Sequence, residues 1–307
     1  MVATANSTKN FDKNSNKNVD KKADVARFDK KVYGLGIRSR MEGIDPILFD
    51  TAIEPIVKVN GEFSRIKTIL SKSQKYTVTL SLEQRSVQGK HTLVVKSGKE
   101  VVIEILEEVN GKGLAFDWEV MIEKGAKATI GRTIYAHSAS VFTTLQMQIQ
   151  SNSTVILKEI IQEGNFVRNQ TMSFLDENVT LTHTTLFHTT HEHEIAASAH
   201  VAGRESTVSL IARGVVEENA KGLFLGELKI MKNAVHCQAH QKSEILLLSQ
   251  QSIGEAVPIL EVENNDVICS HSATVSQIDE EMLFYLQSRG IELETAKKMI
   301  TKGFLRP

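Results

Sequence analysis

The residues best suited to chemistry in this chain are a cysteine and a histidine near its C-terminal end, in the run Cys269-Ser270-His271. If this run is a strand, Cys269 and His271 point to the same side, because residues two apart share a face. A thiolate and an imidazole together suit zinc, copper(I) or an iron–sulfur cluster. A pair is only half of a site, so further ligands must come from elsewhere in the chain or from a second subunit. The alternative interpretation is structural: a buried cysteine beside a hydrogen-bonded histidine.

The second of the two cysteines lies in the run His236-Cys237-Gln238-Ala239-His240. On a strand, Cys237 shares a face with apolar neighbours, whereas His236 and His240 point the other way. We therefore expect Cys237 to be a small buried hydrophobe, and we keep it only as a fallback ligand. The two histidines are either surface ligands or simply exposed polar residues.

A third cluster consists of closely spaced histidines and glutamates: His188, His191, Glu192, His193 and Glu194. On a strand, His191 and His193 share one face and the glutamates share the other. This density suggests a metal or proton-handling site, with a solvated polar rim as the alternative. The spacing is not the helical His-Glu-x-x-His of a zinc protease.

Several catalytic signatures are missing. The chain has no Gly-x-x-x-x-Gly-Lys-Ser/Thr loop, no Gly-x-Gly-x-x-Gly fingerprint and no Gly-x-Ser-x-Gly elbow. We therefore expect that this chain binds no nucleotide and does not hydrolyse one itself. A sugar-cleaving groove is also disfavoured, because the chain has one tryptophan, Trp118, and 6% aromatic residues.

The elements that must position these residues are mainly strands. Between residues 53 and 277, apolar and polar residues alternate in short runs, which is typical of strands with one buried face. Small polar turn clusters recur at intervals of roughly 18 to 30 residues, the range expected when each repeat is one coil of a β-solenoid. A sandwich or jelly roll also produces many short strands, so the pattern favours the solenoid without excluding the other two.

The pattern changes to a helical period in residues 278–307. Asp279 is a plausible N-cap for a first helix that stops at Gly290, and a second helix runs from about Leu293 to Gly303. Two short helices after a β domain either cap an open sheet edge or form a partner-binding face.

Composition limits the partners and the location. A formal net charge of −1 lacks the basic field of a nucleic-acid binder, so we expect no nucleic-acid partner. No segment has the apolar length of a membrane span or a signal peptide, and two cysteines do not make a disulfide framework. We expect a cytoplasmic protein with no membrane partner. Residues 1–24 are predicted to be a disordered tail, and residues 25–52 a short helical or irregular lead-in.

The C-terminal run resembles the end of the SufB/SufD family of iron–sulfur cluster assembly proteins. The resemblance rests on fixed elements that follow Pro258 and Leu260-Glu261-Val262: Cys269, His271, Ala273-Thr274, Phe284-Tyr285, Arg289-Gly290 and Gly303-Phe304. It implies a right-handed parallel β-helix with a C-terminal helical domain. It also implies a scaffold, not an enzyme in its own right, on which a transient iron–sulfur cluster is assembled. Weaker similarity extends back to about Trp118, and the short chain resembles the compact members of minimal systems.

The resemblance also implies partners. Two subunits are expected to pair through their β-helices, and the C-terminal helices are expected to dock the ABC-type ATPase SufC. By motif position, Cys269 and His271 correspond to the SufD-type interface pair. The residues expected to face the ATPase are Phe284, Tyr285, Arg289, Gly290, Gly303 and Phe304.

One departure from the family pattern leaves two interpretations open. The essential cysteine of SufB-type subunits falls at about Ser243, so this chain lacks it. Either the chain is a homodimer that uses Cys269 as its scaffold thiol, or it is a structural or regulatory ATPase partner without its own cluster, needing a SufB-type subunit. In a homodimer, two copies of Cys269 and His271 meet at the two-fold axis and supply four ligands. Glu261, Glu263 or the His191/His193 cluster are further ligand candidates.

Overall fold

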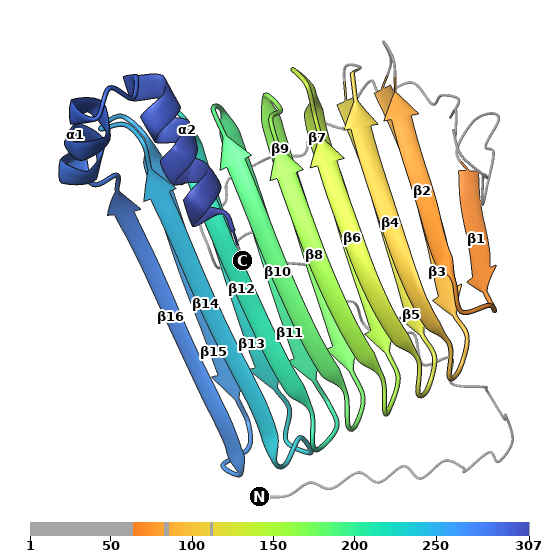
Figure 1. Ribbon diagram of the computed structural model, residues 1–307. Helices are drawn as coiled ribbons and strands as arrows, with labels where there is room; N and C mark the ends of the chain where they lie inside the picture. The colour runs from red at the N-terminus through yellow and green to blue at the C-terminus, as the bar shows by residue number, and fades with distance from the viewer. Residues whose placement is uncertain (1–63, 83–85, 111–112, 307) are drawn as a thin grey trace, which may run out of the picture. The chain divides into compact units, whose positions relative to one another are not determined.

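The described residues form two parallel sheets that lie face to face, followed by two helices (Figure 1). The structure is a computed structural model, and it describes residues 64–82, 86–110 and 113–306. One sheet contains the odd-numbered strands: β1 (Ser64–Leu70), β3 (Ser86–Val95), β5 (Gly113–Ile122), β7 (Ser140–Ile149), β9 (Phe166–Leu175), β11 (Glu192–Val201), β13 (Lys221–Ile230) and β15 (Ile253–Val262).

The other sheet contains the even-numbered strands: β2 (Lys75–Leu82), β4 (Glu100–Val109), β6 (Lys127–Tyr135), β8 (Thr154–Gln162), β10 (Thr180–Thr189), β12 (Thr207–Val216), β14 (Cys237–Leu247) and β16 (Val267–Gln277). The chain therefore crosses from one sheet to the other after each strand. All ladders among the described strands are parallel, and successive partners such as Lys127, Thr154, Thr180 and Thr207 lie 26 or 27 residues apart. This is a β-solenoid, which confirms the predicted fold class and excludes the sandwich and the jelly roll.

One turn position recurs from coil to coil with the same left-handed backbone conformation. Gly98, Gly125, Asn152, Asn178, Glu205 and His236 all have φ between 53° and 70°. Each backbone N–H at these positions donates to the next coil, for example from Asn152 to Glu177 and from Asn178 to Arg204. The side chains of Asn152 and Asn178 also hydrogen-bond to each other at 2.7 Å. Glycine and asparagine tolerate the left-handed conformation, which explains why small polar residues mark the repeat in the sequence.

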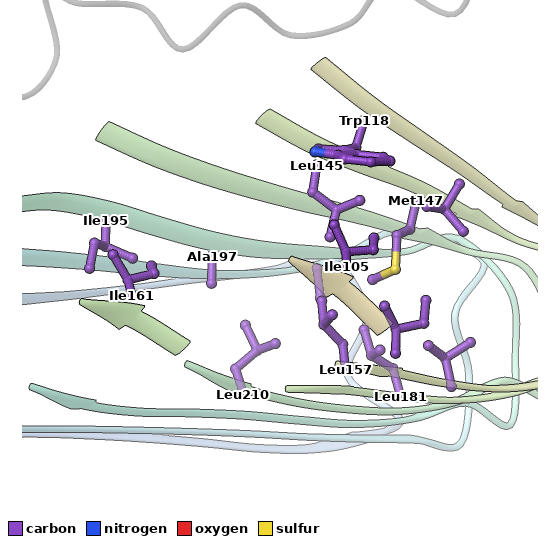
Figure 2. Packing of buried hydrophobic residues seen from close by; sticks show 14 of the residues in the cluster. Ile105, Trp118, Leu145, Met147, Leu157, Ile161, Leu181, Ile195, Ala197 and Leu210 are labelled. Carbon is purple, nitrogen blue, oxygen red and sulfur yellow. The ribbon is translucent and has the colours of Figure 1, made fainter. Parts of the chain in front are cut away.

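The core lies between the two sheets, as expected from the alternation along the strands. Inward-facing side chains such as Ile105, Leu145 and Leu157 interdigitate there (Figure 2). Trp118 is fully buried at the same level of the stack. Burial of this kind contributes about 25 cal/mol per Å² of apolar surface, so the stacked interior is the main source of the solenoid's stability.

The helices follow the last strand. α1 (Glu280–Ser288) begins after Asp279, whose side chain accepts hydrogen bonds from the N–H groups of Glu281 and Met282, so the predicted N-cap is confirmed. Gly290, with φ of 84°, reverses the chain after α1. α2 (Leu293–Phe304) extends one residue beyond its predicted end at Gly303. Gly303 lacks the left-handed conformation of a helix stop, which is why the helix continues through it.

α2 packs on the outer face of the even-numbered sheet. A small second core forms there from Val215 and Leu246 on the sheet and Ile300 and Phe304 on the helix. Arg213 anchors the end of α2, because its guanidinium donates hydrogen bonds to the backbone carbonyls of Phe304 and Arg306. A cation at the C-terminal end of a helix also interacts favourably with the helix dipole.

The predictions for residues 1–24 and 25–52 lie outside the described residues, as does the start of the region predicted as core. Among the described residues, the strands run from Ser64 to Gln277 and the first helix begins at Glu280.

Candidate functional site

Cys269 and His271 lie on β16, the last strand of the even-numbered sheet. β16 pairs only with β14 among the described strands, and Ala239 and Gln241 are the register partners of Cys269 and His271. Both partners are buried and face the interior. Cys269 and His271 therefore also face the solenoid axis, but no further coil of the described residues covers them. Cys269 is half-buried and His271 is exposed.

The surroundings of Cys269 favour a protonated thiol until a metal arrives. Burial raises the pKa of the Cys269 thiol, and the neighbouring Cys237 raises it further, while the backbone of Ala239 opposes both. A metal ion must displace this proton, because the thiolate is the ligand form. Cys269 and His271 together offer one soft and one borderline ligand on a shared face, which fits the donor set of an iron–sulfur site.

The other cysteine has a different environment. Cys237 is 1% exposed, and its thiol contacts the carbonyls of Gly203 and Val235 at 3.3 and 3.5 Å. Burial raises its pKa as well. His240, in contrast, is exposed and contacts Ser270 at 2.8 Å. His236 pairs with Asp266 at 3.0 Å. Cys237, His236 and His240 therefore each have a polar contact within the chain.

The histidine cluster is distant from Cys269. The row of paired residues that starts at His188 ends at Ser276 on β16, five residues beyond His271. Three strand spacings of about 4.8 Å across the sheet and five residues at about 3.3 Å along the strand separate the two places, which gives a diagonal of about 22 Å. His188 therefore cannot complete the site of Cys269 within one subunit, and His193 belongs to the other sheet, on β11.

The prediction that His191 and His193 share one face of a strand is wrong. β11 begins only at Glu192, so His191 lies in the preceding bend and is exposed. His193 is fully buried, and its Nε2–H donates to the Glu163 carbonyl at 2.6 Å. Burial lowers the pKa of His193 to about 4. Glu194 is also buried, paired with Arg168 at 2.6 Å, so the cluster is not a solvated rim throughout.

The structure also reveals a buried charged network that the sequence reasoning missed. Arg132 on β6 has no exposed side-chain surface, and its guanidinium pairs with Glu107 at 3.1 Å and with Glu159 at 2.9 Å. Glu159 further accepts hydrogen bonds from Thr171 and contacts His183 Nε2 at 2.7 Å. The sequence does carry a signal for this network: a charged residue stands where the alternation places side chains inward. Glu107, for example, follows Ile103 and Ile105 at intervals of two residues.

The two carboxyl groups of this network are not equivalent. Burial would raise the pKa of Glu159, but His183, Arg132 and Thr171 outweigh it and hold the pKa at about 2. Burial raises the pKa of Glu107, although Arg132 and the indole N–H of Trp118 oppose it. Glu159 therefore carries the charge that neutralises Arg132, and Glu107 is the carboxyl that takes up a proton more readily.

The polar interior continues towards the open end. His183, Leu210, Gln241 and His271 occupy one row of paired positions across successive coils. The amide of Gln241 and the hydroxyl of Ser243, both buried, have no hydrogen-bond partner among the described residues. Ser243, where the SufB-type cysteine was expected, thus lies inside the solenoid beside β16.

The helical residues expected to meet a partner divide into two groups. Phe284 and Tyr285 on α1 are 73% and 56% exposed, and the Arg289 guanidinium lies 5.3 Å from the Tyr285 ring centre. Gly290 and Gly303 are also exposed. Phe304, however, packs into the second core beneath α2. The exposed aromatic surface therefore belongs to α1.

Two other features, a metal-binding group of side chains and a membrane-spanning helix, are absent from the described residues. No three His, Cys, Asp or Glu side chains there come close enough together to hold a metal ion. No helix in residues 64–306 is both long and apolar enough to cross a membrane.

Comparison with known proteins places the chain in a family. The family model for the SufBD core domain, described as SUF system FeS cluster assembly, matches residues 78–304. This chain belongs to the SufBD family. The match begins well before Trp118, so the resemblance recognised in the sequence extends over nearly the whole described solenoid and both helices.

Individual SufBD relatives match over shorter stretches. The chain is 38% identical to the iron-sulfur cluster assembly protein SufD of Bacillus subtilis over 105 residues, which cover 34% of this chain and 24% of the relative. It is 33% identical over 104 residues to the SufBD family protein ycf24 of Galdieria sulphuraria, covering 34% and 47%. The SufB of Bacillus subtilis is 29% identical over 117 residues, covering 38% and 25%. The matched stretches thus span a quarter to about half of these relatives.

Proposed function

We propose that this SufBD-family protein is a scaffold subunit on which an iron–sulfur cluster is assembled and from which it is transferred. The observation that carries the proposal is the placement of Cys269 and His271 on the uncovered last strand. They face the solenoid axis with no described coil beyond them, in a family whose domain is described as SUF system FeS cluster assembly. The cluster is the cargo of the protein, and its iron and sulfide are supplied from outside.

The second step of the proposal is a homodimer formed through this open end. β15 and β16 are edge strands of their sheets, and unpaired strand edges readily pair with another chain. Exposed apolar side chains surround the edge: Ile253, Val262, Ile268 and Val275. A two-fold axis at this end brings two copies of Cys269 and His271 together. Each subunit then supplies half of a four-ligand site.

The third step assigns α1 to an ATPase partner of the SufC type. The exposed Phe284 and Tyr285 rings form an aromatic surface of the kind that anchors protein interfaces. ATP hydrolysis belongs to that partner in this proposal, and the subunit described here performs no catalysis itself. The expected location of such a scaffold is the cytoplasm, where thiols remain reduced.

Anaerobic reconstitution with iron and sulfide tests the scaffold role. The wild type should develop a visible absorption band, and Cys269→Ala and His271→Ala should lose most of it. Cys237→Ala is the matched control, because the same atom is removed from a thiol that is buried and occupied, and it should retain the band. If Cys269→Ala builds the same cluster as the wild type, Cys269 is not the scaffold thiol. If the wild type builds none unless a SufB-type subunit is added, the chain is the ATPase partner without its own cluster.

Light scattering after gel filtration tests the dimer. Ile268→Glu introduces a charge at the open end, on a side chain that is 62% exposed, and should convert dimers to monomers. Ile156→Glu is the control, because Ile156 is a 48% exposed residue of the same sheet far from that end. Equal masses for both variants and the wild type would contradict pairing through β16.

A binding assay with a purified SufC-type ATPase tests the docking surface. Phe284→Ala combined with Tyr285→Ala should weaken binding at least about tenfold, since two exposed aromatic anchors are removed. Met121→Ala, at an exposed residue of β5, should leave the affinity unchanged. Unchanged binding by the double variant would place the ATPase elsewhere.

A further inference from the structure

A cavity of about 530 Å³ lies between the C-terminal half of α2 and the outer face of β8 and β10. This volume falls in the range of sites for small organic ligands. The cavity is on the outside of the solenoid, whereas Cys269 and His271 face its axis. It is therefore separate from the proposed cluster site and does not depend on it.

The inner wall of the cavity is apolar. Ile160 and Leu186 are register neighbours on β8 and β10, and both point away from the solenoid core. Leu186 is only 6% exposed despite its outward direction. Leu305, just after α2, adds a further apolar side chain. An apolar group of a ligand can therefore lie between the sheet residues and Leu305, in van der Waals contact with protein on both sides.

The rim of the cavity is basic. Lys158, Lys298, Lys302 and Arg306 line it, and the one carboxylate is Glu217. Glu217 lies 3.5 Å from His188, and its pKa is lowered by the hydrogen bond with His188 and by the charges of Lys297 and Lys298, so cations outnumber it around the cavity. The side chains of the four basic residues form no ion pair or hydrogen bond with another described residue. By contrast, Lys90, Lys96 and Lys229 on the outer faces of the solenoid each pair with a glutamate within 2.7 Å.

A further polar group in the wall also lacks a partner. The hydroxyl oxygen of Thr301 on α2 is buried and has no hydrogen bond among the described residues. Leaving a buried hydroxyl unpaired is unfavourable, so a ligand that forms a hydrogen bond with it gains affinity from doing so. The wall is also held in place, because Arg213 binds the backbone carbonyls at the end of α2. The cavity therefore exists before any ligand arrives.

We propose that this cavity binds a small organic anion. Its apolar body lies against Ile160 and Leu186, and its carboxylate, sulfonate or phosphate group lies among Lys158, Lys298 and Lys302. Charge complementarity favours this occupant: unpaired cations surround the cavity in a chain whose overall formal charge is −1. Because such a ligand contacts both α2 and the sheet, its binding also fixes α2 on the solenoid.

Fluorescence titration with 8-anilinonaphthalene-1-sulfonate, an apolar dye with one anionic group, tests the site on the full chain. The wild type should bind the dye saturably with one site. Lys298→Glu combined with Lys302→Glu should weaken binding at least about tenfold, since two attractive charges become repulsive. Lys297→Glu is the matched control, because it changes the same charge on the same helix at a residue that does not line this cavity, and it should weaken binding much less than the double variant does.

A variant on the sheet and a set of competing ligands complete the test of the cavity. Lys158→Gln is on the sheet rather than on α2, and it should weaken dye binding even if the helix variants disturb α2. Naphthalene-1-sulfonate should displace the dye at concentrations at least about tenfold lower than inorganic phosphate or 2-naphthol, because only the sulfonate carries both charge and rings. No saturable binding by the wild type, equal losses in Lys297→Glu and the double variant, or full displacement by phosphate alone would each overturn the proposal. So would displacement by an acidic peptide but not by naphthalene-1-sulfonate.

Discussion

The inward-facing side chains of β14 and β16 occupy equivalent positions in neighbouring coils but have opposite surroundings. On β14, the inward residues Cys237, Ala239 and Gln241 are at most 3% exposed. On β16, Cys269 is half-buried and His271 is exposed, although they continue the same rows. The difference between the two strands is that, in the part of the chain that the structure describes, β14 has a coil on both sides and β16 has a coil on one side.

This difference separates a structural role from a chemical one. Charged groups enclosed by coils pair within the chain, as Arg132 and Glu159 do, because an unpaired buried charge is costly. Cys269 and His271, which no described coil covers, are instead accessible from outside, as the proposed cluster site requires. The position along the solenoid axis, rather than residue type, therefore distinguishes Cys237 from Cys269.

The largest predicted effect tests the enclosed region. Arg132→Met leaves Glu159 and Glu107 buried without their cation, and we expect the free energy of unfolding to fall by about 3–5 kcal/mol. Urea denaturation followed by circular dichroism measures this. Arg204→Met is the control, because Arg204 forms an exposed pair with Glu177, and it should cost less than about 1 kcal/mol. Similar losses for both variants would show that the interior network is not tightly enclosed.

The next effect uses pH on the same enclosed region. Burial holds the pKa of His193 at about 4, below its usual value of 6.5. The neutral folded form is therefore fully stable above pH 6.5, and stability is lost as the pH falls from 6.5 towards 4, because the unfolded chain binds the proton more readily. Between pH 7 and pH 5 the loss from this residue should be about 2 kcal/mol.

His193→Gln removes this titration while keeping a hydrogen-bond donor for the Glu163 carbonyl. Its free energy of unfolding, measured by urea denaturation at each pH, should decline less than that of the wild type between pH 7 and pH 5. His240→Gln, at an exposed histidine, should decline as the wild type does. A His193→Gln profile parallel to the wild type would exclude His193 as the source of the pH dependence.

The sequence predicts the repeating part of the molecule well. Alternation of apolar and polar residues predicts the strands, and recurring small polar residues predict the turns, because glycine and asparagine accept the left-handed conformation found at Gly125, Asn152 and Asn178. Asp279 and Gly290 likewise predict the limits of α1, since capping depends only on local backbone geometry.

Contacts between coils were harder to predict. The alternation within β6 and β8 already places Arg132 and Glu159 on the inward faces of their strands. That the two residues meet depends on the register in which β6 pairs with β8, which neither strand shows by itself. His191 and His193 were misplaced because the start of β11 shifts one of them into a bend. The shared face of Cys269 and His271 could be predicted because both residues lie on one strand. Their exposure could not, because it depends on where the stacking of the described coils ends.

A smaller effect tests the connection of α2 to the solenoid. Arg213→Met removes the hydrogen bonds to the carbonyls of Phe304 and Arg306, and it also breaks the ion pair with Glu244. We expect a loss of about 1.5 kcal/mol and faster hydrogen exchange in α2, measured by mass spectrometry. Lys229→Met, which breaks an outer-face pair with Glu261, should leave exchange in α2 unchanged. Unchanged exchange in Arg213→Met would show that the second core alone holds α2.

The smallest predicted effect compares the two cysteines directly. Cys237→Ala removes a thiol that is enclosed by coils and should reduce the free energy of unfolding by about 1 kcal/mol, because a small cavity remains. Cys269→Ala removes a half-buried thiol at the open end and should cost less than about 0.5 kcal/mol, since water fills the space. Urea denaturation of monomeric protein, at a concentration below that of dimer formation, measures both. Equal costs would mean that the monomer already covers Cys269, and the contrast between enclosed and open coils would fail. A small stability cost together with loss of cluster formation in Cys269→Ala would show that this thiol serves chemistry rather than folding.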